Sequence, residues 1–212
     1  MTAQLHILNA SGSLSHLLQN IESAYQAAIS RVEALIPIDG VNVLVSHHPN
    51  GVIPEYSIGG YAPRADVAEI FVDSHDPEIK LKLERHLLCV LGHELHHCAR
   101  WRSTGYGKTL GEAIVTEGLA CAFEGELVSG FQPFYARALN DQALLDGISK
   151  AHKDWDRSDY DHASWFFGSS LMARHTGYTI GYEIVSRYIR NTGQPASRLI
   201  DVCASEVRGV QP

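Results

Sequence analysis

The segment that most restricts how this chain can fold is the run CVLGHELHHCARW at residues 89–101. It has the composition of a helix with an apolar core face, yet His93, Glu94, His96 and His97 interrupt that face. Burial of such groups costs free energy unless they are paired or bind a metal ion. The segment therefore predicts a helix with a chemical task as well as a packing role.

The spacing of His93 and His97 is typical of a metal-binding helix. Residues four apart project from one helical face one turn apart, so both imidazoles can reach one ion, and imidazole suits Zn²⁺. Glu94 follows the first histidine directly, where it can flank the metal without ligating it and take a proton from metal-bound water. A helix face that collects imidazoles for no chemical reason is the alternative interpretation.

A catalytic zinc site needs a third protein ligand and a position left for water. A metzincin would require glycine and histidine three and six residues after His97, but Arg100 and Ser103 stand there. A deformylase-like site takes a cysteine from an EGCLS segment upstream, whereas this chain has EGLAC downstream. A gluzincin takes a glutamate from a following helix, often about twenty residues on, and this pattern is the one the chain can satisfy.

Glu117 lies twenty residues after His97 in the run GEAIVTEGLACAFEGEL. It belongs to an otherwise apolar helical stripe: Leu110, Ile114, Glu117 and Cys121. An ionised carboxylate on such a stripe is expensive unless it is paired or metal-bound, so Glu117 is the predicted third ligand and a structural ion pair is the alternative. Glu124, one heptad further on, either orients a ligand histidine or is exposed.

Periodicity and turn signals predict one helix, then strands, then further helices. The expected helices cover residues 13–36, 77–103, 109–128, 133–152, 178–191 and 195–209, and the expected strands cover 41–48, 52–62 and 67–73. Gly59-Gly60 is expected to form a turn or bulge, and Thr109 to Glu112 has the form of a capping box. The polar stretch 150–164 is the predicted loop. This order of elements is typical of an α+β fold.

The predicted organisation is a single domain over residues 1–212. Its three parts are an N-terminal helix and small sheet at 1–76, the metal-site helices at 77–130 and a C-terminal helical part at 131–212.

Composition narrows the class of protein. The net charge of −7 and the absence of Lys/Arg clusters argue against nucleic-acid binding. No apolar run approaches the roughly 18 residues of a membrane span, and the first residues lack the pattern of a secretory signal. The four cysteines show no CxxC spacing and are predicted to be buried, reduced thiols. A cytoplasmic protein is expected, with no indication of its oligomeric state.

Three segments together resemble a known family: LGHELHHCARW, LGEAIVTEGLACAFEGEL and WFFGSSLMARHTGYTIGYEIVSRYI. They are similar to predicted zinc-dependent proteases of the gluzincin type, a domain of unknown function, and the resemblance covers about residues 80–190. It implies a zincin-like fold with a small sheet packed on a mainly helical domain. It also implies one zinc ion held by His93, His97 and Glu117, with Glu94 as catalytic base. Better-known gluzincins carry an acidic residue four positions after the ligand glutamate, where this chain has Cys121.

An electrophilic group that stabilises the oxyanion is expected in the run ARHTGYTIGYEIV. It offers His175, Tyr178 and Tyr182, and Tyr178 or His175 is the predicted residue, with ordinary aromatic packing as the alternative. The strand at 67–73 is expected to pair with an extended peptide substrate.

These inferences predict a zinc metallopeptidase with one Zn²⁺ per chain and a peptide or protein substrate. The zinc lowers the pKa of a bound water towards roughly 7, and Glu94 transfers its proton to the leaving amine. The alternative is a non-catalytic metal-binding or regulatory protein that retains the HExxH scaffold. A purely structural helical domain with a histidine-rich face is a weaker rival.

Overall fold

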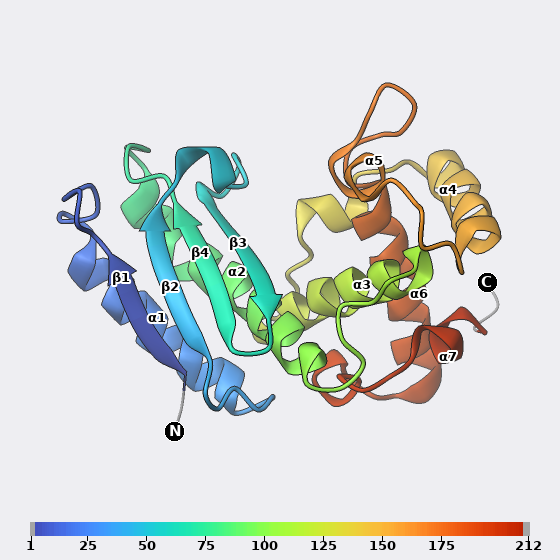
Figure 1. Ribbon diagram of the computed structural model, residues 1–212, viewed down its shortest axis with the longest axis horizontal. Coiled ribbons are helices and arrows are strands. Elements are labelled where there is room, and N and C mark those ends of the chain that lie inside the picture. Colours follow the sequence, from blue (N-terminus) through green and yellow to red (C-terminus); the bar gives the residue numbers. More distant parts are fainter. Residues whose placement is uncertain (1–2, 210–212) are drawn as a thin grey trace. The chain divides into compact units, whose positions relative to one another are not determined.

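A four-stranded sheet frames the first of two units into which the chain divides after Arg102 (Figure 1). The computed structural model describes residues 3–209. The strands, in the spatial order β1-β2-β4-β3, are β1 (Gln4–Leu8), β2 (Asn42–His47), β4 (Val67–Val72) and β3 (Ile58–Arg64). β1, β2 and β4 run parallel, whereas β3 is antiparallel to β4. With the helices of both units, this sheet makes the protein a mixed α+β structure, which confirms the predicted class.

The sheet differs from the sequence-based expectations in two places. β1 was not predicted, because five residues of mixed polarity carry little periodic signal until β2 pairs with them. Gly59 and Gly60 lie within β3 and form neither the expected turn nor a bulge, since they pair regularly with Phe71 and Ile70 and the register shift falls between Tyr61 and Arg64. Glycine inside a strand often marks the close approach of another group. A Cβ built on Gly59 would lie 2.1 Å from the backbone oxygen of Gly51.

Two helices, α1 (Leu18–Glu33) and α2 (Ile79–Trp101), lie along one face of this sheet (Figure 1). β2 shows the matching alternation: Val43 and Val45 are buried, and Leu44 between them is half-buried. This one-sided pattern is typical of a sheet whose core is supplied by helices on one face. It places the apolar side of α2 in the core of the unit.

The start of α2 is held by a polar cluster. Asp76 accepts hydrogen bonds from the hydroxyl of Ser57, from Lys82 Nζ at 2.7 Å and from the backbone N–H of Glu78 at 2.9 Å. These contacts, chiefly the one with Lys82, lower the pKa of Asp76 to about 2. The helix begins at Ile79, two residues later than Asp76-Pro77 predicted, since Asp76 caps the preceding turn.

The second unit is built around two helices, α3 (Leu110–Leu127) and α6 (Thr176–Thr192), which cross at glycines (Figure 1). A Cβ built on Gly118 would lie 2.2 Å from the backbone oxygen of Gly181, and one on Gly181 would lie 2.3 Å from that of Ile114. The two backbones therefore pack directly against each other. Around this pair lie α4 (Asp141–Asp154), α5 (His162–Phe167) and α7 (Ala204–Arg208).

In the second unit, the helices other than α3 and α6 differ from the expected ranges. The range 133–152 holds a short 3₁₀ helix at Phe134–Arg137 followed by α4, and 195–209 holds another at Ala196–Arg198 followed by α7. The polar stretch 150–164 contains the end of α4 and the start of α5, so only its middle is a loop. Polar composition indicated solvent exposure there, which amphipathic helices share with loops.

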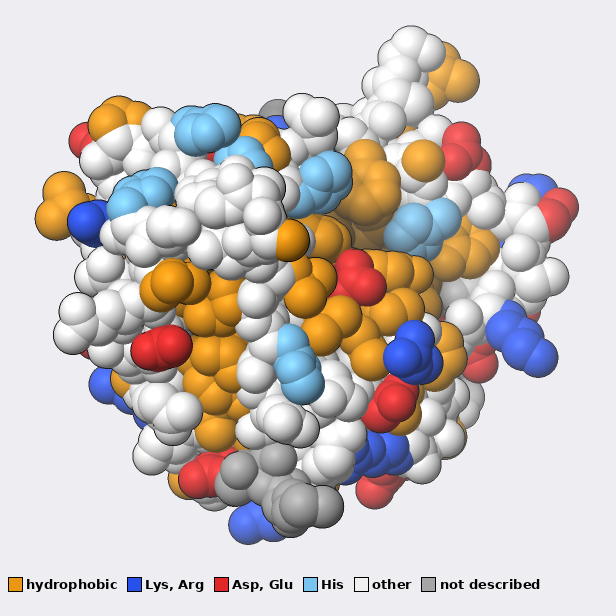
Figure 2. All heavy atoms as spheres, turned by 60° about the vertical axis from the view of Figure 1, so that its left-hand side comes forward, with side chains coloured by type: hydrophobic (Ala, Val, Ile, Leu, Met, Phe, Trp, Pro, Cys, Tyr) orange, Lys and Arg blue, Asp and Glu red, His pale blue; other side chains and the backbone are white. Residues whose placement is uncertain are grey.

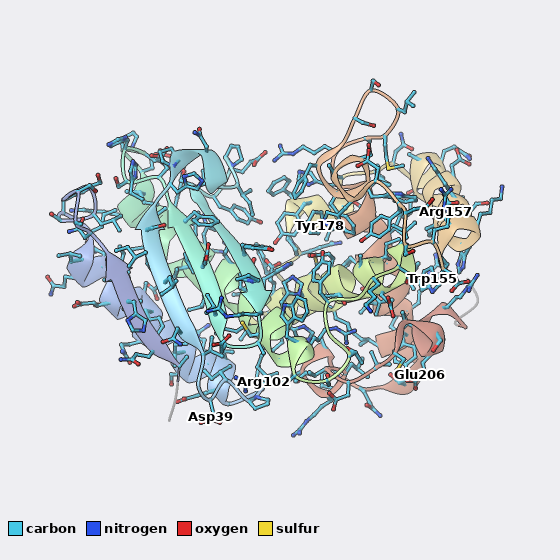
Figure 3. The ribbon with its side chains drawn as sticks, in the orientation of Figure 1. Asp39, Arg102, Trp155, Arg157, Tyr178 and Glu206 are labelled. Atoms are coloured by element: carbon cyan, nitrogen blue, oxygen red, sulfur yellow. The ribbon has the colours of Figure 1, made fainter. Side chains whose placement is uncertain are left out.

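The position of α3 is set at its first turn. Thr109 and Glu112 form the predicted capping box: Glu112 N–H donates to Thr109 Oγ1 at 3.3 Å, and Glu112 Oε2 accepts from Thr109 N–H at 2.9 Å. The N–H groups of Leu110 and Gly111 donate to the carbonyls of Arg157 and Trp155 at 3.0 and 2.9 Å. Both acceptor residues are labelled in Figure 3. The start of α3 is thus fully bonded.

Three of the four cysteines are buried, as predicted, and all four are free thiols. Cys203 is exposed, so the expectation of burial is wrong for this residue.

Across residues 3–209, the helices are all too short or too polar to cross a bilayer.

Candidate metal centre

α2 presents His93 and His97 from one face. The centroids of their imidazole rings are 4.7 Å apart and the ring planes are 87° to each other. Both residues are buried, at 7% and 5% exposure. The remaining histidines include several at the surface (Figure 2), whereas His96 and His175 are also buried. The spacing on one helical face, together with burial, is therefore what sets this pair apart.

Glu94 lies against the backbone of the edge strand β3. A Cβ built on Gly60 would lie 2.6 Å from Glu94 Cγ and 2.7 Å from Glu94 Oε1. The absence of a side chain at Gly60 therefore makes room for the buried carboxylate. This contact gives a reason for a glycine in the strand, where the sequence had indicated a turn or bulge.

Cys98, one turn after Glu94 on α2, contacts the sheet. Burial, with a contribution from the Glu94 carboxylate, raises the pKa of Cys98 to about 12. The protonated thiol donates to the backbone oxygen of Val67, with a sulfur–oxygen distance of 3.4 Å. Its role is to join α2 to the sheet.

Glu117 is buried in α3 at 5% exposure, and its carboxylate has a short hydrogen bond. The hydroxyl of Tyr106 donates to Glu117 Oε1 at 2.6 Å. Burial, followed by the nearby Glu117 charge, raises the pKa of Tyr106 well above its usual value. The phenol is therefore protonated at neutral pH and acts as the donor.

Glu124 is fully buried, and the Tyr135 hydroxyl donates to its Oε1 at 2.5 Å. Of the two alternatives given for Glu124, surface exposure is therefore wrong, and a role in orienting a ligand histidine stays a prediction. Cys121 and Glu124 are also residue types that could hold a metal ion. Burial, then the charges of Glu124 and Glu117, raises the pKa of Cys121 well above its usual value, so Cys121 is a thiol.

The two residues predicted to stabilise an oxyanion lie together at the start of α6. His175 precedes the helix with a left-handed backbone (φ 68°) and is buried. Tyr178, labelled in Figure 3, has its ring centroid 5.9 Å from that of His175 and 5.2 Å from that of Tyr135. Aromatic packing accounts for these positions, and the catalytic assignment stays a prediction.

The structure adds Tyr106, Tyr160 and His162 to the surroundings of Glu117. The His162 ring stacks on Phe166 with centroids 4.5 Å apart, and its Nδ1 lies 3.2 Å from the Tyr160 hydroxyl. Burial lowers the pKa of His162, and the Glu117 charge partly opposes this. Sequence reasoning missed all three, although a tyrosine between two glycines in TGYGKT was a visible signal for Tyr106.

The donor types present fit zinc. His93, His97 and Glu117 offer two imidazole nitrogens and one carboxylate oxygen, the set found in many catalytic zinc sites. All three side chains are buried, and burial of such groups is compensated when they bind a cation.

These features define an α+β protein with buried histidines and carboxylates that could bind a metal ion. The chain belongs to the family described as Predicted Zn-dependent protease (DUF2268), whose profile matches residues 17–208. This membership confirms the resemblance seen in the sequence and extends it beyond residues 80–190. No curated protein and no solved structure matches the chain.

Proposed function

We propose that the protein is a zinc metallopeptidase that binds one zinc ion through His93, His97 and Glu117 and uses Glu94 as general base. The observation that carries the proposal is the buried pair of imidazoles on one face of α2 with Glu94 beside them. Membership of a family described as a predicted Zn-dependent protease supports it. Zinc, when bound, lowers the pKa of a bound water towards about 7 and polarises the scissile carbonyl.

Glu94 supplies the proton transfer. Its carboxylate accepts a proton from the attacking water and delivers it to the leaving amine. The contact with Gly60 limits where the carboxylate can lie, since Glu94 Cγ and Oε1 rest against the strand backbone. Such restriction favours catalysis because a base must lie within hydrogen-bond reach of the proton it removes.

An extended peptide is the substrate class that the sheet supports. β4 pairs with both β2 and β3, so the expectation that residues 67–73 receive the peptide is wrong. Among the strands described, β3 stands at the end of the sheet beside β4, and its Gly60 touches Glu94. A peptide that adds to β3 as a further strand would pass the general base.

Metal analysis tests the proposal. Purified protein is expected to contain about one zinc ion per chain, since two histidines and one carboxylate form a catalytic site. Chelation should abolish hydrolysis of a peptide library, and added zinc should restore it. Glu117→Gln should weaken zinc binding about tenfold or more, because a neutral amide replaces a charged ligand. Purified protein that takes up no zinc would contradict the proposal.

Gly60→Ala tests the placement of Glu94. The new Cβ meets the side chain of Glu94, which can move, so the fold should persist while the carboxylate shifts. We expect kcat to fall about 10- to 100-fold, since a displacement of about 1 Å costs up to that much, with zinc content unchanged.

The neighbouring glycine provides the matched control. At Gly59 the added Cβ meets the backbone of Gly51, which cannot rotate away, so Gly59→Ala should lower Tm more than Gly60→Ala does. Wild-type kcat in Gly60→Ala would show that the contact has no catalytic consequence.

A further inference from the structure

The loop before α3 holds Tyr106 in a defined place. Gly105 and Gly107 flank it with φ angles of 77° and 107°, a region that residues with side chains rarely adopt. A Cβ built on Gly107 would also lie 2.3 Å from Glu112 Cβ. The chain therefore turns sharply on both sides of the tyrosine.

Hydrogen bonds from α3 fix this loop. The Thr116 hydroxyl donates to the backbone oxygen of Tyr106 at 3.0 Å. Glu112 Oε2, which also takes part in the capping box with Thr109, accepts from the N–H of Lys108 at 2.7 Å. Tyr106 is thus bonded to the helix that carries Glu117, through Thr116, the residue directly before Glu117.

The phenol of Tyr106 acts on one defined atom. Its hydroxyl donates to Glu117 Oε1 at 2.6 Å, the short length typical of a bond to a charged acceptor. A donor on Oε1 restricts rotation of the Glu117 carboxylate about its Cγ–Cδ bond. The second carboxylate oxygen, Oε2, is then already oriented when a cation binds.

We propose that Tyr106 is a positioning residue that orients the Glu117 carboxylate for single-oxygen ligation of zinc. This inference rests on the proposed function, in which Glu117 is a ligand. It assigns a role to the loop between α2 and α3 that neither the HExxH spacing nor the family membership contains. Partners that orient metal ligands change metal affinity about 10- to 100-fold when removed.

A purely structural role makes the opposite prediction. If the phenol merely stabilises a buried carboxylate in the metal-free protein, then zinc competes with it for Glu117. Its removal would leave zinc binding equal or tighter. If the phenol preorients the carboxylate, its removal weakens zinc binding, so the direction of the change separates the two roles.

The test is the zinc affinity of Tyr106→Phe, measured by competition with a chromophoric chelator. We expect the zinc dissociation constant to rise about tenfold. Thr116→Val, which leaves the phenol in place but removes the bond that fixes its backbone, should change affinity in the same direction by less. It also provides the measurement if Tyr106→Phe does not fold.

Tyr25→Phe is the matched control, because its buried hydroxyl donates to the backbone oxygen of Ala3 at 2.8 Å and involves no carboxylate. Zinc affinity should be unchanged in this variant. Equal or tighter zinc binding in Tyr106→Phe would overturn the inference and leave the proposed function intact. A wild-type protein that binds no zinc would instead refute the proposed function.

Discussion

Glu94→Gln is expected to reduce peptide hydrolysis about 10³-fold, within the range of general acid–base catalysis. The amide has nearly the same shape as the carboxylate but cannot accept a proton at neutral pH. Zinc content should remain at the wild-type value, because Glu94 is assigned as base and not as ligand. The loss should therefore appear in kcat, with the metal in place.

The measurement is kcat on a peptide substrate together with the zinc content of the same preparation. Glu84→Gln is a suitable control, since Glu84 is an exposed glutamate of the same helix α2. Unchanged turnover in Glu94→Gln would favour a non-catalytic metal-binding or regulatory protein. Loss of zinc would show that Glu94 is a ligand, and the assigned roles would have to be exchanged.

Gly181→Ala is expected to lower the free energy of unfolding of the protein by about 3 kcal/mol. This is the upper end of the cost of adding a methyl group to a closely packed site. The added methyl group would lie 2.3 Å from the backbone oxygen of Ile114 and 3.1 Å from Gly118 Cα. Backbone atoms cannot rotate out of the way as side chains do, so α3 and α6 must separate. Because Glu117 precedes Gly118, the same shift should weaken zinc binding.

Urea unfolding with Gly147→Ala as control measures this effect. The control also adds a methyl group to a helix of the second unit, but its nearest contact is Ile180 Cδ1, the flexible end of a side chain. Its stability should change little or rise, since alanine exceeds glycine in helix propensity by about 1 kcal/mol. Equal stability of the two variants would show that α3 and α6 can move apart at Gly118 and Gly181 without loss of stability.

Local features of this protein could be predicted from its sequence. The ranges expected for α2 and α3 agree with the structure within about two residues at each end, because helical periodicity depends on residues only three or four positions apart. The capping box of Thr109 and Glu112 depends on the same short range. The shared face of His93 and His97 follows from their spacing once the helix exists.

Contacts between distant residues could not be predicted in this way. Gly60 lies beside Glu94 although 34 positions separate them, and the Tyr135 hydroxyl reaches Glu124 from beyond the end of α3. β1 likewise exists because a partner strand completes its hydrogen bonds. None of these pairs leaves a periodic signal in the sequence.

The sequence by itself determined the helices α2 and α3 and the histidines and carboxylates that they carry, because backbone propensity and side-chain spacing act over a few residues. Only the tertiary structure decided which strand stands beside Glu94 and which tyrosine hydroxyl donates to Glu117. The reason is physical: such neighbours are selected by close packing and by the bonding needs of buried polar groups. Both requirements act through space between residues that are remote along the chain.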